Sequence, residues 1–231
     1  MARVSRAAYA EAFHRATGGR LVALPQLAGA SDSEIFFESL ALNETPSGGA
    51  GGLRGPGGNR RQLADNDLLA CYNSELAAAF GARSALLAEQ GRLLPGARDA
   101  LAATARLPGV IQSVLTGTIK QNAEHKLKAF GLDGYVDLSV GGFGSDVYPK
   151  GTLILRSLDL ARAKYGVPLT PADVVYIADS VRDIAAAKVA AVRSVGVASG
   201  RSRAAELRGA GADVVLDDLS DPALVVAAVS P

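Results

Sequence analysis

The chain has 231 residues, enough for one large domain or for a domain with an insertion. Its 24 basic and 23 acidic residues leave a net charge of +1, which gives no electrostatic argument for binding nucleic acid or an acidic membrane surface. One cysteine, no apolar run long enough for a bilayer and no signal-peptide pattern together exclude an intrachain disulfide and predict a cytoplasmic protein without a membrane partner.

The first 90 residues predict helices and loops without a convincing strand. A helix over 3–17 ends at a pair of glycines, and a further helix is expected over 61–80. Between them, Ser31 followed by Glu34 forms a capping-box pattern that opens another helix. The Gly-rich segment 47–58 follows no buried strand and lacks the spacing of a nucleotide-binding loop, so it predicts a surface loop.

The pattern changes after Leu94-Pro95-Gly96, where apolar strands begin to alternate with helices. The predicted helices are 96–106, 119–130, 151–165, 181–191 and 201–209. The predicted strands are 110–115, 135–140, 173–178, 193–198 and 213–216, with a glycine-rich loop over 141–145. This alternation predicts an α/β, Rossmann-like parallel sheet flanked by helices. Right-handed crossovers place the carboxyl ends of all its strands along one edge.

Polar side chains follow three of these strands. Thr116 and Thr118 follow the first, Lys150 follows the second after its loop, and Asp179 and Asp183 follow the third. Ligands bind open α/β sheets at this edge, and two close carboxylates are typical of a hard-cation site such as Mg²⁺. Each residue also has a plainer explanation: the threonine and the two acids could cap helices, and the lysine could be solvated.

In this order the motifs resemble those of the haloacid dehalogenase superfamily of hydrolases, in its phosphoglycolate-phosphatase-like branch. Ser113–Thr118 is similar to the second motif of that family, an apolar strand ending in Thr or Ser, and Lys150 matches its third motif. Ile177–Asp183 resembles the fourth motif, with Ala178 in place of the common glycine. The resemblance implies an α-helical cap over 1–92 and a core over 93–231.

The resemblance also implies a reaction and a set of site residues. It implies hydrolysis of a small phosphorylated metabolite through an aspartyl-phosphate intermediate. Thr116 and Lys150 would be catalytic and, with Gly117, would bind the phosphate, while Asp179 and Asp183 would hold Mg²⁺.

One motif of the family is missing. Its first motif is Asp-x-Asp at the end of an apolar strand just before the cap, and the first of these acids is the nucleophile. Met1 stands where the first cap helix should begin, and Asp65-Asn66-Asp67 follows no buried strand. We therefore expect this form to be inactive and its start to be truncated or wrongly assigned.

The missing strand also bears on folding and on partners. In the family it lies between the strands expected at 110–115 and 173–178, so its loss would leave their backbone groups unpaired. The sheet could close up, or a partner chain could fill the gap and make an oligomer. The alternative functions are a catalytically degenerate binding protein of the same fold and a receiver-like or nucleotide-binding α/β domain.

Overall fold

The computed structural model describes residues 2–27, 30–43, 65–145 and 150–230. The chain forms two compact units. The helical unit comprises Met1–Gly91 with Gly117–Ala129, and the α/β unit comprises Arg92–Thr116 with Phe130–Pro231. The Gly-rich segment 47–58 lies outside the described residues, and the division into a cap and a core at residue 92 stays a prediction.

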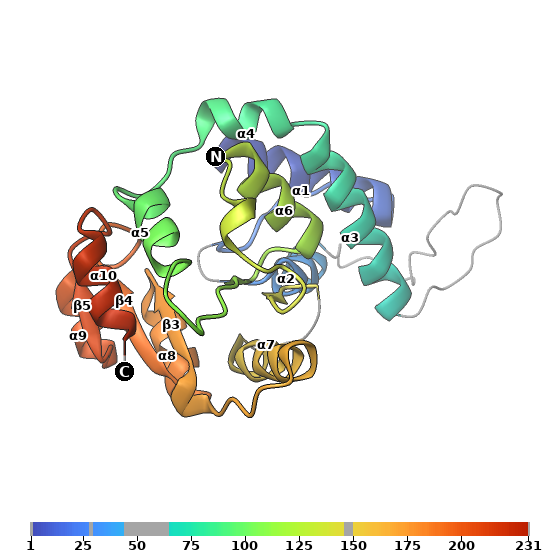
Figure 1. Cartoon of the computed structure of the whole chain (residues 1–231). Helices are drawn as coiled ribbons and strands as arrows, with labels where there is room; N and C mark the ends of the chain where they lie inside the picture. Colours follow the sequence, from blue (N-terminus) through green and yellow to red (C-terminus); the bar gives the residue numbers. More distant parts are fainter. Residues whose placement is uncertain (1, 28–29, 44–64, 146–149, 231) are drawn as a thin grey trace. The chain divides into compact units, whose positions relative to one another are not determined.

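The described helices of the helical unit surround one apolar core (Figure 1). They are α1 (Ala2–Thr17), α2 (Asp32–Asn43), α3 (Asp65–Gly81), α4 (Ser84–Gln90) and α6 (Lys120–Ala129). Aromatic rings join three of them: Phe36 stacks on Tyr72 with ring centroids 4.3 Å apart, and Tyr9 meets Phe80 edge to face at 6.3 Å. Such pairs add to the stabilisation that comes from burying apolar area.

The capping box predicted at the start of α2 is confirmed. The Glu34 N–H donates to Ser31 Oγ at 3.2 Å, and the Ser31 N–H donates to the Glu34 carboxylate. Ser31 and Glu34 therefore satisfy backbone donors that the first turn of a helix leaves without partners.

The α/β unit contains the strands and the remaining helices. Its helices are α5 (Ala97–Thr104), α7 (Lys150–Tyr165), α8 (Val181–Val189), α9 (Ala204–Ala210) and α10 (Pro222–Val229), with 3₁₀ turns η1 (Asp133–Tyr135) and η2 (Pro171–Asp173). Its strands are β1 (Leu115–Thr116), β2 (Gly142–Phe143), β3 (Val175–Ala178), β4 (Arg193–Val197) and β5 (Val214–Leu216). Helices α8 and α9 contact each other and β4, while α5 and α10 contact each other (Figure 1).

The strands are parallel, which confirms the predicted α/β class, but they form two sheets. One sheet pairs β1 with β2, and the other has the order β3-β4-β5. Within the described ranges β1 and β3 share no ladder. This break falls between the strands expected at 110–115 and 173–178, which the family resemblance does not expect to pair directly.

The strand predicted over 135–140 is wrong. The segment contains the end of η1 and a turn, and β2 lies instead at Gly142–Phe143, inside the predicted glycine loop. The cause is local, because Asp137 Oδ1 accepts hydrogen bonds from both the N–H and the hydroxyl of Ser139. A side chain that bonds its own backbone two residues on favours a turn over a strand.

The strand predicted over 110–115 is also too long, since only its last residue, with Thr116, pairs as a strand. The preceding residues make single bonds to the turn instead. The Asp137 N–H donates to the Gln112 carbonyl, and Ser113 Oγ donates to the Asp137 carbonyl. Because this neighbour is a turn, no regular ladder can form along it.

Helix α10 was not predicted, although its start carries clear signals. Asp221 is its N-cap and accepts from the N–H groups of Ala223 and Leu224, and Pro222 occupies the first helical position. Proline suits that position because its missing N–H would have no helical partner there. No helix that the structure describes is both long and apolar enough to cross a membrane.

Candidate active site

Asp179 lies directly beyond the last residue of β3, at the carboxyl end of a parallel strand, as the sequence predicts. The loop after β4 holds its backbone, because the Ser202 N–H donates to the Asp179 carbonyl at 3.0 Å. The same loop approaches its side chain so closely that a Cβ added to Gly200 would collide with Asp179 Cβ, Cγ and Oδ2. Asp179 is therefore positioned by β3 and by the 200–202 backbone together.

Asp183 lies in the first turn of α8 and is buried. Its Oδ2 accepts from the Ser180 hydroxyl at 2.6 Å, and its N–H donates back to the Ser180 oxygen at 3.3 Å. Asp183 thus takes part in the N-terminal capping of α8, which was the plainer explanation of this acid. The remaining oxygen, Oδ1, accepts from the Tyr176 hydroxyl at 3.1 Å.

Tyr176, in the middle of β3, contacts Asp183 and was not singled out from the sequence. Burial is the main cause that raises the pKa of its phenol, and the charges of Asp183 and Asp179 raise that pKa further. Both acids therefore lie within electrostatic reach of one hydroxyl. The available signal was a tyrosine in an apolar strand, because a buried tyrosine hydroxyl needs a partner.

Thr116 is the last residue of β1. Its neighbour Leu115 connects β1, through hydrophobic contacts, with the segment that carries the two acids. Leu115 and Tyr176 both pack on the cluster of buried residues that includes Ile154 from α7 and Ala187 from α8. This shared core ties β1 to the β3-α8 segment within the α/β unit, although the two strands are in different sheets.

Two other predicted site residues have less structural support. Lys150 begins α7, and its side chain lies outside the described residues. Gly117 belongs to the helical unit, directly after Thr116. The roles assigned to Thr116, Gly117, Lys150, Asp179 and Asp183 stay predictions.

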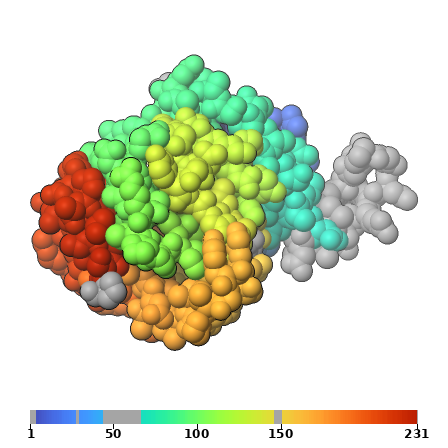
Figure 2. Space-filling view, in the orientation of Figure 1, coloured from blue at the N-terminus to red at the C-terminus, as the bar shows by residue number. Residues whose placement is uncertain are grey.

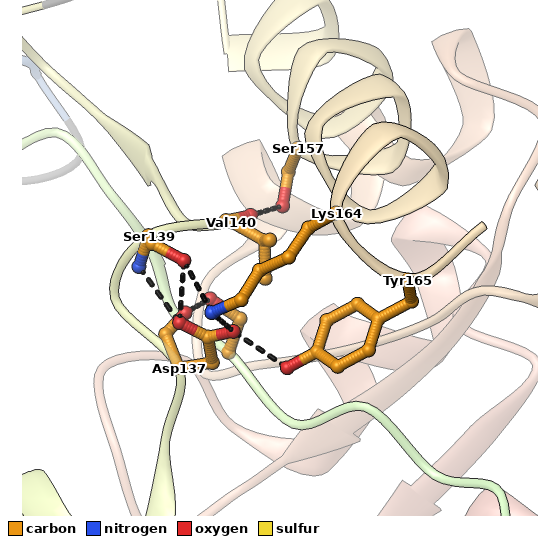
Figure 3. Close-up of polar contacts among 7 residues, drawn as sticks. Asp137, Ser139, Val140, Ser157, Lys164 and Tyr165 are labelled. Atoms are coloured by element: carbon orange, nitrogen blue, oxygen red, sulfur yellow. Dashed lines mark hydrogen bonds and ion pairs between the residues drawn. The ribbon is translucent and has the colours of Figure 1, made fainter.

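The end of α7 is fixed to the turn that precedes β2 (Figure 3). Lys164 and Tyr165 point from this end toward Asp137, and their Nζ and hydroxyl groups donate to its Oδ2 at 2.5 and 2.6 Å. Ser157 donates from the preceding turns of the helix to the Val140 carbonyl. These contacts fix the helix that begins at Lys150 against β2, and they use Lys164 as a structural cation rather than a phosphate ligand.

Asp179 and Asp183 offer oxygen ligands for a metal ion, but they are only two carboxylates. In the part of the chain that the structure describes, no group of three or more His, Cys, Asp or Glu side chains could hold a metal ion. Two carboxylates without nitrogen or sulfur ligands fit Mg²⁺, which keeps several waters and takes further oxygens from a bound phosphate. The acids fit a magnesium site completed by a ligand better than a closed structural site.

Comparison with known families gives two matches. A model described as haloacid dehalogenase-like hydrolase matches residues 38–188, and one described as HAD-hydrolase-like matches residues 155–222. No curated protein matches the chain. The first of these models spans more than half of the sequence, including the segments that carry Thr116, Lys150 and both acids.

Solved structures share the fold. CbbY from Rhodobacter sphaeroides, crystallised with phosphate, has a TM-score of 0.59 and 23% identity over 95% of this chain and 89% of its own. A HAD hydrolase of family IA, variant 3, from Entamoeba histolytica has a TM-score of 0.61 and 14% identity over 98% and 92%. A putative β-phosphoglucomutase from Thermotoga maritima has a TM-score of 0.52 and 19% identity over 99% and 93%.

Proposed function

We propose, from the premise that this chain belongs to the haloacid dehalogenase-like hydrolase family, that it is the scaffold of a Mg²⁺-dependent phosphatase for a small phosphorylated metabolite. The observation that carries the proposal is the placement of Asp179 and Asp183 around Tyr176 at the end of β3. Two acids within electrostatic reach of the same hydroxyl favour a cation beside them.

Asp179 and Asp183 would hold the ion. When bound, Mg²⁺ neutralises charge on a phosphoryl group. The Ser180 and Tyr176 hydroxyls donate to Asp183, so they orient its carboxylate. The 200–202 backbone fixes Asp179 and leaves it few alternative rotamers.

The phosphate would be bound at the end of β1. A threonine hydroxyl and the backbone N–H groups that follow are suitable donors for a phosphate oxygen, which is the role proposed for Thr116 and Gly117. Lys150, at the start of α7, would supply a cation for the same phosphate. Phosphoryl transfer depends mainly on such positioning and charge stabilisation.

We further propose that the present chain does not turn over substrate by itself. An aspartyl-phosphate intermediate needs a carboxylate that attacks phosphorus, in addition to the two acids assigned to the metal. Among the described residues no third acid joins Asp179 and Asp183. Asp67, the described acid of the Asp65-Asn66-Asp67 sequence, lies in the first turn of α3 in the other unit.

The first test separates binding from turnover. The wild-type chain should bind inorganic phosphate in a Mg²⁺-dependent way, measured by calorimetry, and should not hydrolyse p-nitrophenyl phosphate. Asp179→Asn should weaken Mg²⁺-dependent binding at least about tenfold, since removal of one charge from a two-acid site forfeits a charge-assisted contact.

Asp173→Asn is the matched control for this test. Asp173 lies in the same unit and accepts from the Thr170 N–H and hydroxyl, so its loss affects a turn and not the acid pair. Turnover by the wild-type chain that Asp179→Asn abolishes would show that a nucleophile is present and that the inactivity proposal is wrong. Equal phosphate affinity in Asp179→Asn and Asp173→Asn would contradict the metal assignment.

A second experiment separates the phosphatase scaffold from a degenerate binding protein, the alternative function. An apolar strand ending in Asp-x-Asp-Gly-Thr is fused ahead of residue 1. A phosphatase scaffold should gain Mg²⁺-dependent turnover, and changing the first added Asp to Asn should remove it. A fusion that folds and binds phosphate but stays inactive favours the binding protein.

A further inference from the structure

Asp32 is a buried acid whose hydrogen bonds connect the start of α2 with a distant loop. It is 2% exposed, and its Oδ2 accepts from the Ile119 N–H at 2.7 Å. Its own backbone N–H donates to the Gly117 carbonyl at 2.7 Å. One residue therefore bonds both ends of the segment 117–119, hereafter the 117–119 loop, which directly follows Thr116.

The backbone at Ala30 and Ser31 approaches the 117–119 loop as closely as two backbones can. A Cβ added to Gly117 would lie 2.7 Å from the Ala30 carbonyl oxygen and 2.8 Å from Ser31 Cα. These distances are too short for any side chain, so only glycine permits this packing. The 117–119 loop is consequently held by contact on one side and by hydrogen bonds at both ends.

The remaining bonds of this cluster support the carboxylate and the loop. Tyr9 donates its hydroxyl to Asp32 Oδ1 at 2.6 Å, and Lys126 Nζ donates to Thr118 Oγ1 at 3.1 Å. The charge of Lys126 also acts on Asp32 and favours its ionised form. All of these residues belong to the helical unit.

Helix capping does not account for the Asp32 carboxylate. The start of α2 is capped by the reciprocal bonds of Ser31 and Glu34, so the first turn does not need a second acceptor. Burying a carboxylate costs free energy and raises the pKa of Asp32 through desolvation. An acid that is buried at this cost and bonded to a loop backbone fixes that loop.

We infer that Asp32 is a positioning residue for phosphate binding: by fixing Gly117 and Ile119 it holds the backbone donors that follow Thr116 in the geometry that a phosphate requires. The inference rests on the proposed function, because the 117–119 loop continues the proposed phosphate-binding strand end. It assigns no contact between Asp32 and the phosphate. Pre-organised donors bind an anion more tightly because they lose less freedom on binding.

The experiment measures loop order and phosphate affinity in the full chain. The variants are Asp32→Ala, which removes both side-chain bonds of Asp32, and Gly117→Ala, which disturbs the same contact from the other side. The probe is inorganic phosphate with Mg²⁺, and its affinity is measured by calorimetry. The order of the loop is read from the Ile119 amide, whose downfield proton shift and slow hydrogen exchange report the bond to the carboxylate.

Asn43→Ala is the matched control. The Asn43 side chain makes four hydrogen bonds in the same unit, to the backbone of Val22, Ala23 and Ser39, and none of these involves the 117–119 loop. It should lower the melting temperature without changing the Ile119 amide or the phosphate affinity.

Asp32→Ala and Gly117→Ala should both release the Ile119 amide and weaken phosphate binding at least about tenfold. Phosphate affinity that falls no further in these variants than in Asn43→Ala overturns the inference, and so does an Ile119 amide that stays protected in Asp32→Ala. Failure of the wild-type chain to bind phosphate contradicts the proposed function instead. The amide measurement needs no ligand, so the two failures are distinguishable.

Discussion

Gly200 shows how one residue without a side chain can set the position of a functional acid. Because a Cβ at this position would collide with Asp179, Gly200→Ala must displace either the carboxylate or the loop after β4. We expect a loss of about 1–3 kcal/mol in the free energy of unfolding, as is usual for overpacking. We also expect about tenfold weaker Mg²⁺ binding, measured by calorimetry.

Gly209→Ala provides the control for Gly200. Gly209 lies within α9, and a Cβ added there would meet no atom within 4 Å. An alanine in a helix should stabilise the α/β unit by about 0.5–1 kcal/mol and leave Mg²⁺ binding unchanged. If Gly200→Ala also keeps its Mg²⁺ affinity, the position of Asp179 does not depend on this contact.

Asp137 gives a second prediction at the scale of one residue, about how the stability of the protein depends on pH. Hydrogen bonds from Lys164, Tyr165 and Ser139 hold the pKa of its carboxyl well below the ordinary value of about 3.9. A lowered folded-state pKa gives stability that is complete above the unfolded-state pKa and is lost as the pH falls toward the folded-state value.

The stability of Asp137→Asn relative to the wild type tests this linkage. The wild type should be more stable by a constant amount between about pH 5 and pH 8, and the difference should shrink below about pH 4. Denaturant unfolding at each pH measures it. A difference that stays constant down to pH 2 would show that the Asp137 charge contributes nothing to the fixing of α7.

Individual residues were predictable where a single motif determines them. Asp179 and Asp183 were singled out because acids after a buried strand are conspicuous, and the capping box of Ser31 and Glu34, a short-range pattern, is confirmed. The proposed roles of Tyr176 and Asp32 were not predicted, because their partners, Asp183 and Ile119, are identified only by the fold. Sequence spacing does not show that residues 32 and 119 are neighbours.

At the scale of elements, helices were predicted better than strands. The helix expected over 151–165 is observed as Lys150–Tyr165, whereas the strand expected over 135–140 is a turn. A helix bonds within its own segment, so its residues largely specify it. A strand needs a partner, and the Asp137 side chain competes successfully for the backbone that would have paired.

Helix α6 carries a prediction about an element of the helical unit. Its buried face includes Asn122, which is 0% exposed, and neither amide atom of Asn122 has a hydrogen-bond partner among the described residues. A buried amide without partners costs about 1–3 kcal/mol, so Asn122→Leu should raise the free energy of unfolding by an amount in that range. Thermal or denaturant unfolding measures the change.

Substitution of Asn43 by leucine should instead lower the free energy of unfolding. The Asn43 amide bonds the backbone of Val22, Ala23 and Ser39, so Asn43→Leu removes these bonds and leaves partners unsatisfied. Destabilisation by both substitutions would indicate that Asn122 has a role that the described contacts do not explain.

For the whole molecule, the division of the α/β unit into two sheets determines which backbone is least protected. Strand β4 is bonded on both edges, by β3 and β5, whereas β1 has one two-residue ladder to β2. Isolated two-stranded pairs are marginally stable in water, and exposed strand edges invite pairing with another segment. The shared contacts of Leu115 and Tyr176 therefore hold the two sheets together, although β1 and β3 share no ladder in the part of the chain that the structure describes.

Native-state hydrogen exchange tests this account across the α/β unit. Amides of β4 should exchange at least about tenfold more slowly than those of β1 and β2, because local opening of a two-residue ladder exposes less surface than opening of a central strand. The fusion that adds an apolar strand should raise the protection of β1 and β3 toward that of β4, because a strand bonded to both would extend their ladders. Equal protection of β1 and β4 in the unfused chain would show that the α/β unit opens as one sheet and that its division into two sheets does not set its local stability.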